Sequence, residues 1–104
     1  RKSPTVTTEV LVDNDASSGF SIFDVYTRDR VGVLHTIAKT FRDQKLSIAL
    51  SKVNTEGTRV ADVFYVEDEA GGKVRDAARL QSAREALQRA LESFEIEAGE
   101  RGEA

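Results

Sequence analysis

The stretch Tyr26-Thr27-Arg28-Asp29-Arg30-Val31-Gly32-Val33-Leu34 carries most of the information about the fold of this chain. It begins as a strand, breaks into a charged turn that contains a glycine, and then opens a helix. The first N–H groups of a helix lack intrahelical partners and lie at the positive end of its dipole. A polar turn at this junction can therefore hold a small anionic or zwitterionic ligand.

Further along, the apolar run Val60-Ala61-Asp62-Val63-Phe64-Tyr65-Val66 contains a single carboxylate. We interpret Asp62 as an outward- or turn-facing side chain rather than an active acid, because no Ser or His stands close to it in the sequence. Few other residues of the chain suit chemistry. This contrast favours a domain that binds a small molecule over one that transforms it.

Composition narrows the choice of function. The 104 residues suit one domain, and the absence of cysteine excludes a disulfide framework or a thiolate metal site. A net charge of -3 leaves no broad basic face for nucleic acid or anionic lipid. No stretch approaches the roughly 20 apolar residues of a membrane span, and no signal-peptide pattern is present. We therefore expect a cytoplasmic protein with no cofactor, no metal, and no nucleic-acid or membrane partner. Because the chain lacks methionine and begins at Arg1, we also expect it to be a piece of a longer protein.

Hydrophobic periodicity predicts the order strand, strand, helix, strand, strand, helix. The expected strands cover residues 5–12, 20–27, 46–54 and 59–67, and the expected helices cover residues 32–44 and 78–93. Helical spacing places a set of apolar side chains under the sheet: Leu34, Ile37, Phe41, Leu87 and Leu91. This order predicts an α+β sandwich in which both helices cover one face of an antiparallel sheet.

The domain is expected to cover residues 5–94. A disordered lead-in over residues 1–4 precedes it, and an acidic, glycine-containing tail over residues 95–104 is expected to be disordered as well. The alternation over residues 94–97 leaves a short edge strand open as an alternative. Several expected strands carry apolar residues on both faces, so we expect the helix-free face to pair with a second copy or a sister domain.

These residues resemble the ACT domain, a small ferredoxin-like module that senses amino acids. The match is carried by residues 28–34, where the family usually shows Asp-Arg-Pro-Gly-Leu-Leu, and by Gly57 with residues 60–68. The second run is most similar to the C-terminal ACT domain of the bifunctional uridylyltransferase/uridylyl-removing enzyme, which modifies the nitrogen-signalling PII protein. The usual ACT order is βαββαβ, so the resemblance implies a four-stranded sheet in which the N-terminal strand replaces the usual last strand.

The resemblance also implies a function. The chain would be a regulatory domain that binds an amino acid, with glutamine the implied ligand, and that controls an attached uridylyltransferase/uridylyl-removing enzyme of nitrogen metabolism. Contact with PII would occur only through that parent enzyme, and this chain would hold no catalytic residue. The implied ligand-binding residues belong to the turn and to the start of the third strand: Arg28, Asp29, Arg30, Val31, Gly32, Val33, Leu34, Ser47, Ile48 and Ala49. In this family the strand residues often come from a neighbouring copy.

The turn residues also have plainer interpretations. Gly32 could serve only the tight turn, and Asp29 could cap the helix. Arg28 and Arg30 are interpreted as solvated surface charges rather than ligand clamps. His35, the only histidine, is interpreted as a surface or boundary residue.

Two departures from the family pattern support an alternative function. Val31 stands where the family has proline, and Thr27 stands where it often has glycine. Residues 47–49 could likewise be an ordinary strand. The alternative is an ACT-like interaction or dimerisation module whose ligand pocket is degenerate.

Overall fold

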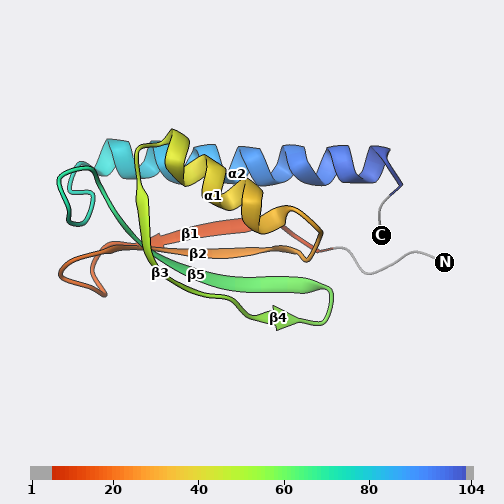
Figure 1. Cartoon of the computed structure of the whole chain (residues 1–104), viewed down its shortest axis with the longest axis horizontal. Coiled ribbons are helices and arrows are strands. Elements are labelled where there is room, and N and C mark those ends of the chain that lie inside the picture. Colours follow the sequence, from red (N-terminus) through yellow and green to blue (C-terminus); the bar gives the residue numbers. More distant parts are fainter. Residues whose placement is uncertain (1–5, 103–104) are drawn as a thin grey trace.

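A computed structural model describes residues 6–102 of the chain (Figure 1). Strands and helices follow one another in this order: β1 (Glu9–Asp13), β2 (Ser21–Arg28), α1 (Val33–Asp43), β3 (Ser47–Lys52), β4 (Thr55–Glu56), β5 (Arg59–Glu67) and α2 (Ala77–Glu100). No helix in this described part is long and apolar enough to cross a membrane.

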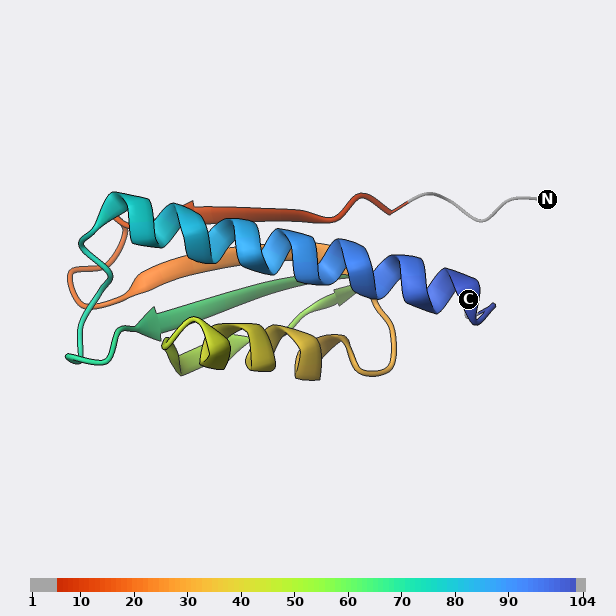
Figure 2. The same ribbon diagram turned by 90° about the horizontal axis from the view of Figure 1, so that it is seen from above.

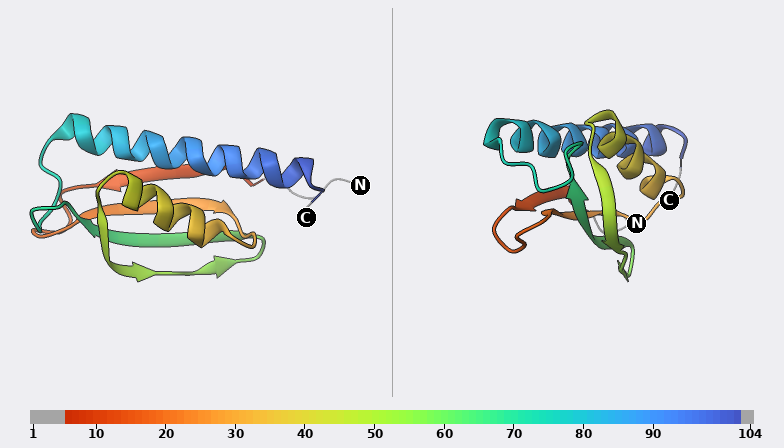
Figure 3. Two further views of the ribbon diagram at one scale, coloured as in Figure 1. Left: turned by 45° about the horizontal axis from the view of Figure 1, so that its top comes forward. Right: turned by 60° about the vertical axis from the view of Figure 1, so that its left-hand side comes forward.

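The strands form one antiparallel sheet with the order β1-β2-β5-β3, and the short β4 also pairs with β5. Both helices lie side by side over one face of the sheet, as the view from above and the two oblique views show (Figures 2 and 3). The predicted α+β architecture is therefore confirmed. β1 occupies the sheet edge beside β2, and no strand follows α2 within residues 6–102, which agrees with the expected replacement of the last strand.

The sheet has five strands rather than four because the expected strand over residues 46–54 ends at Lys52, and the chain pairs with β5 again at Thr55–Glu56, where a turn is expected. The backbone N–H of Asn54 turns away from a regular ladder and donates to the Asp62 side chain at 3.0 Å. The Asn54 carbonyl accepts from the Ala61 N–H at 2.8 Å, so the break stays attached to β5. Gly57, with a φ of 64°, closes the turn that returns the chain from β4 to β5.

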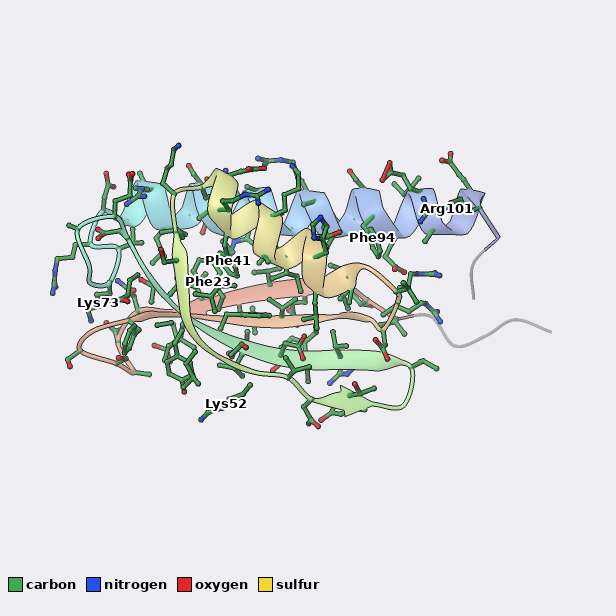
Figure 4. The ribbon with its side chains drawn as sticks, viewed as in Figure 1. Phe23, Phe41, Lys52, Lys73, Phe94 and Arg101 are labelled. Atoms are coloured by element: carbon green, nitrogen blue, oxygen red, sulfur yellow. The ribbon has the colours of Figure 1, made fainter. Side chains whose placement is uncertain are left out.

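The core lies between the helices and the sheet. The ring of Phe41 meets the ring of Phe23 edge-on, with centroids 5.0 Å apart, and the ring of Phe64 at 5.6 Å. Figure 4 shows Phe41 and Phe23 facing each other across this layer. Ile37, Phe41, Leu87 and Leu91 are buried as predicted.

Leu34 is the exception, because its side chain is 45% exposed. α1 begins at Val33, and its buried stripe runs through Val33, Ile37 and Phe41, at intervals of four residues. The predicted stripe was rotated by about one position, which points Leu34 away from the core.

The second helix is longer than expected. Asp76 caps its start by accepting from the Ala78 N–H at 2.9 Å, and the helix continues to Glu100. Residues 95–100 are therefore helical rather than a disordered tail, and the alternative edge strand over residues 94–97 is wrong. Ala98 is fully buried, so packing extends the helix beyond its main apolar stripe. The predicted lead-in over residues 1–4 and the last two residues lie outside the described residues.

Candidate functional site

The turn between β2 and α1 is the centre of the candidate site. The Asp29 N–H donates to the Thr58 carbonyl at 2.9 Å, which ties this turn to the turn between β4 and β5. The Val33 N–H donates to the Arg30 carbonyl at 3.1 Å. Gly32 precedes the helix with a φ of 92°, a left-handed conformation that side chains other than glycine adopt only with strain. Both turns lie at the same end of the sheet (Figure 1).

A hollow of about 390 Å³ opens beside this turn, which is large enough for a small ligand. One wall comes from the turn and the first residues of α1, and the other comes from the β3–β4 break and the start of β5. The residues that line it are Asp29, Arg30, Gly32, Val33, Leu34, His35, Val53, Thr55 and Val60. The exposure of Leu34 is explained by this position, since its side chain lines the hollow instead of the core.

The electrostatics of the hollow suit a zwitterion. No side chain caps the start of α1, so its N–H groups are not occupied by Asp29 as the capping interpretation supposed. The Asp29 carboxylate is exposed, and it makes no ion pair or side-chain hydrogen bond with any other residue between 6 and 102. The site therefore offers hydrogen-bond donors for a carboxylate and an acceptor for an ammonium group close together.

Arg28 and Arg30 are held by α2 rather than solvated. One carboxylate, that of Glu95, approaches the Arg30 Nε through Oε2 at 2.5 Å and the Arg28 Nε through Oε1 at 3.7 Å. The side chains of Arg30 and Arg28 are only 8% and 16% exposed. The interpretation as solvated charges is therefore wrong. Glu95 was missed because the sequence placed it in an acidic tail.

A side chain of α2 also lies beside Gly32. A methyl group added to its α-carbon would meet the ring of Phe94 at 3.6 Å, and Figure 4 shows Phe94 on the side of α2 that faces α1. That separation is an ordinary contact, so the backbone conformation is the stronger reason for glycine at this position. The Phe94 ring of α2 therefore lies next to the side-chain position of Gly32 in the β2–α1 turn.

The structure separates the two groups of expected ligand-binding residues. Ser47 pairs with Glu67 at one end of β5, whereas Val60 and the hollow lie at the other end. Seven residues of strand correspond to about 23 Å, so residues 47–49 do not reach the hollow of their own chain. Val31 is 95% exposed and lies outside the lining. The strand side of the hollow is instead lined by Val53, Thr55 and Val60. These residues were not predicted from the sequence because the β3–β4 break was not anticipated.

Asp62, near the site, is buried, contrary to its prediction from the sequence. It is 1% exposed and faces the helices, so its interpretation as an outward- or turn-facing residue is wrong. Its Oδ1 accepts from Asn54, whereas its Oδ2 is buried without a hydrogen-bond partner in the described part of the chain. Burial raises the pKa of this carboxyl, the Asn54 hydrogen bond lowers it, and the charge of Asp29 raises it further.

Residues 6–102 contain no group of three or more His, Asp or Glu side chains that could hold an ion. His35 is exposed at the rim of the hollow, as its interpretation as a surface or boundary residue predicted.

Comparison with known proteins places this geometry in a family. A family model described as "ACR9-like, ACT-like domain" matches residues 9–103. The chain is 42% identical over 89 residues to the bifunctional uridylyltransferase/uridylyl-removing enzyme of Caulobacter vibrioides, covering 86% of this chain and 10% of the enzyme. It is 39% identical over 87 residues to the enzyme of the same description from Rhodospirillum rubrum, covering 84% of this chain and 9% of that protein. The chain thus spans about a tenth of the length of these relatives.

Proposed function

We propose a sensing role for this chain, which belongs to the ACT-like domain family. In this role it binds an amino acid, with glutamine as the expected ligand, in the hollow beside the start of α1. Binding regulates a larger uridylyltransferase/uridylyl-removing enzyme of which the domain is a part; the relatives named above carry that description. Any contact with the PII protein is then made by the parent enzyme.

One observation carries the proposal: the start of α1, which has no side-chain cap, and the Asp29 carboxylate, which has no partner among residues 6–102, border the same small hollow. An α-amino acid carries a carboxylate and an ammonium group on one carbon. The carboxylate fits the N–H groups of Leu34 and His35, since that of Val33 already donates to the Arg30 carbonyl, and the ammonium fits Asp29. The apolar walls formed by Val33, Val53 and Val60 suit the methylene groups of a side chain.

A route from ligand to regulation runs through α2. The turn that borders the hollow is joined to α2 by the Arg30–Glu95 ion pair. α2 spans the whole length of the sheet (Figure 3). A ligand that prefers one arrangement of the turn therefore biases the position of α2, and with it the attached domains.

In an assembly with a second copy or a sister domain, residues 47–49 of one domain would line the hollow of the other. All six residues of β3 are exposed, so this edge of the sheet is open to another strand. The opposite edge is occupied by α2: Gln88 Oε1 accepts from the Val10 N–H at 3.0 Å, and Arg84 donates to the Val10 carbonyl at 3.2 Å. Pairing through β3 is thus favoured over pairing through β1.

The exposed apolar surface supports the alternative function, an interaction or dimerisation module. Leu11 is 46% exposed and Leu50 is 51% exposed, and the sheet register places both on the helix-free face. The half-buried Tyr65 lies beside Leu50 on that face, with Phe20 against its ring. Such a face is typical of protein contacts, and it would serve the same purpose with or without a ligand.

Titration by NMR separates the two functions. Addition of millimolar glutamine to the ¹⁵N-labelled domain is expected to shift amide signals at residues 28–35 and 53–60. Asp29→Asn removes the partner of the ammonium group and should weaken binding about ten- to a hundredfold, the equivalent of about 1.5–3 kcal/mol. Asp15→Asn, an exposed loop acid at the other end of the sheet, is the matched control and should leave the affinity unchanged. If no amino acid in a complete panel shifts these signals, the interaction module is the better description.

A further inference from the structure

We propose that two copies of this chain pair through the helix-free face of the sheet, about a two-fold axis that runs along β5 and sets Asp24 of each copy against Lys52 of the other. The inference rests on the alternative interaction function and names its partner, a second copy. It depends on the sheet face and not on the hollow beside α1, so it holds whether or not an amino acid binds there.

The helix-free face is open and apolar along its middle. Both helices lie over the opposite face, and no helix or strand within residues 6–102 forms a second layer on this one (Figures 2 and 3). Leu11 and Leu50 are exposed here, and Val63 and Tyr65 of β5 are half-buried. An apolar surface of this kind is typical of protein contacts.

One row of paired residues carries two opposite charges across this face. Asp24 of β2 pairs with Val63 of β5, and Val63 pairs in turn with Lys52 of β3. Figure 4 shows Lys52 on the side of the sheet away from the helices, and its Nζ lies 5.5 Å from the centre of the Tyr65 ring. The row is therefore acidic on β2 and basic on β3, with an apolar residue between.

Neither charge is neutralised in the part of the chain that the structure describes. Asp24 and Lys52 make no ion pair with any residue between 6 and 102. They cannot pair with each other readily, because two strand spacings separate their backbones by about 10 Å. Burial, and then the charge of Asp13, raise the pKa of Asp24. A cation supplied by another molecule would offset both effects.

A two-fold axis along β5 makes this row complementary to itself. Rotation about that axis places β2 of one copy over β3 of the other, so the contact between Asp24 and Lys52 forms twice. Val63 and Tyr65 lie on the axis, and each faces its own counterpart. Sheets packed face to face lie about 10 Å apart with strand directions within about 30° of each other, so residues of the same row meet near the axis.

This contact differs from the addition of a strand at the β3 edge. In the order β1-β2-β5-β3, β5 separates β2 from that edge, so the Asp24 side chain does not reach a strand added beside β3. Face pairing also leaves the backbone of the β3 edge free, and the two contacts are compatible. A dependence of pairing on Asp24 therefore identifies the face.

Charge reversal tests the proposal by analytical ultracentrifugation of the 104-residue chain at high micromolar concentration, where the wild type should form dimers. Asp24→Lys brings two cations together at both contacts, and Lys52→Asp brings two anions together. Each variant should weaken dimerisation at least about a hundredfold. An equal mixture of the two variants should restore the dimer, because both contacts then join a lysine to an aspartate.

Asp43→Lys is the matched control, because it reverses an exposed charge on α1, which lies over the opposite face. It should leave dimerisation unchanged. A second measurement keeps both charges. The chain has no cysteine, so Val63→Cys supplies a single thiol on the axis, which a short bis-maleimide should cross-link to its counterpart. Lys39→Cys, on the outer face of α1, should not cross-link.

Two results would overturn the proposal. One is a wild-type chain that stays monomeric and a Val63→Cys variant that does not cross-link. The other is a dimer that tolerates both charge reversals, which would place the contact at the β3 edge instead. Neither result bears on the sensing function, which the glutamine titration tests separately.

Discussion

Replacing Glu95 by glutamine should destabilise the domain by about 1.5–3 kcal/mol, the range for hydrogen bonds to charged groups that are largely removed from water. The glutamine keeps the size of the side chain and removes its charge. Glu95 serves Arg28 and Arg30 together, and all three side chains are at most 21% exposed. Two unit charges about 4 Å apart interact by about 4 kcal/mol at an effective dielectric constant near 20, and desolvation offsets part of this gain.

The chain contains a matched control for this change. Lys39 and Asp43 form an ion pair at 3.0 Å on the outer face of α1, but both side chains are more than half exposed. Asp43→Asn should cost no more than about 0.5 kcal/mol. The cost at the exposed pair should also shrink at 1 M salt, whereas the cost at Glu95 should persist.

Urea denaturation followed by circular dichroism measures both variants. A loss of 2 kcal/mol would lower the melting temperature by roughly 8–16 °C in a domain of this size. A cost below about 0.5 kcal/mol for Glu95→Gln, equal to that of the control, would refute the argument that α2 holds the β2–α1 turn. It would also remove the proposed link between the hollow and α2.

Three further outcomes test the core, the turn and the buried acid. Phe41→Ala should cost about 3–5 kcal/mol in urea melts, as for other buried aromatic deletions, whereas Leu34→Ala should cost only about 1 kcal/mol because the side chain is half exposed. Gly32→Ala should cost about 1–2 kcal/mol because of its left-handed φ, and Gly19→Ala, in open space without that φ, should cost much less; equal costs would contradict this assignment. The raised pKa of Asp62 means that the folded state binds more protons than the unfolded chain just above pH 3.8, so this group's contribution to stability falls as the pH rises from there. Asp62→Asn should therefore gain stability relative to wild type between pH 3 and pH 7, and a constant difference would show that the carboxyl is not perturbed.

The sheet and the helix positions could be predicted because they follow from local patterns. The β-branched strands and the spacing of Ile37, Phe41, Leu87 and Leu91 reflect burial that each segment shows by itself. The turn over residues 28–34 was found for a similar reason, since its charges and its glycine stand together in the sequence. The order of strands in the sheet was implied by the family resemblance rather than by periodicity.

The errors have a shared physical cause, because each depends on a contact between distant segments. The sequence around Glu95 indicates an acidic tail, because its ion pairs with Arg28 and Arg30 join segments that are far apart in the sequence. The buried Asp62 carboxylate accepts a hydrogen bond from Asn54 at the β3–β4 break, and no glycine or proline at residues 52–55 predicts that break. Leu34 and Val33 differ by one helical position, and only the packing of α1 on the sheet decides which of them is buried. Local propensity carries no information about these choices.

The site residues and the stabilising residues of this domain are therefore closely connected. Arg30 lines the hollow and is paired with Glu95 of α2, and Asp62 supports the β3–β4 break, whose flanking residues Val53 and Thr55 line the same hollow. Stability alone does not call for a left-handed turn without a side-chain helix cap, or for a buried Asp62 oxygen that has no hydrogen-bond partner within residues 6–102. The buried Oδ2 atom of Asp62 has a cost in the folded domain, because a polar atom removed from water without a hydrogen-bond partner loses its hydration. A ligand in the proposed hollow would contact the β2–α1 turn, which the Arg30–Glu95 ion pair joins to α2.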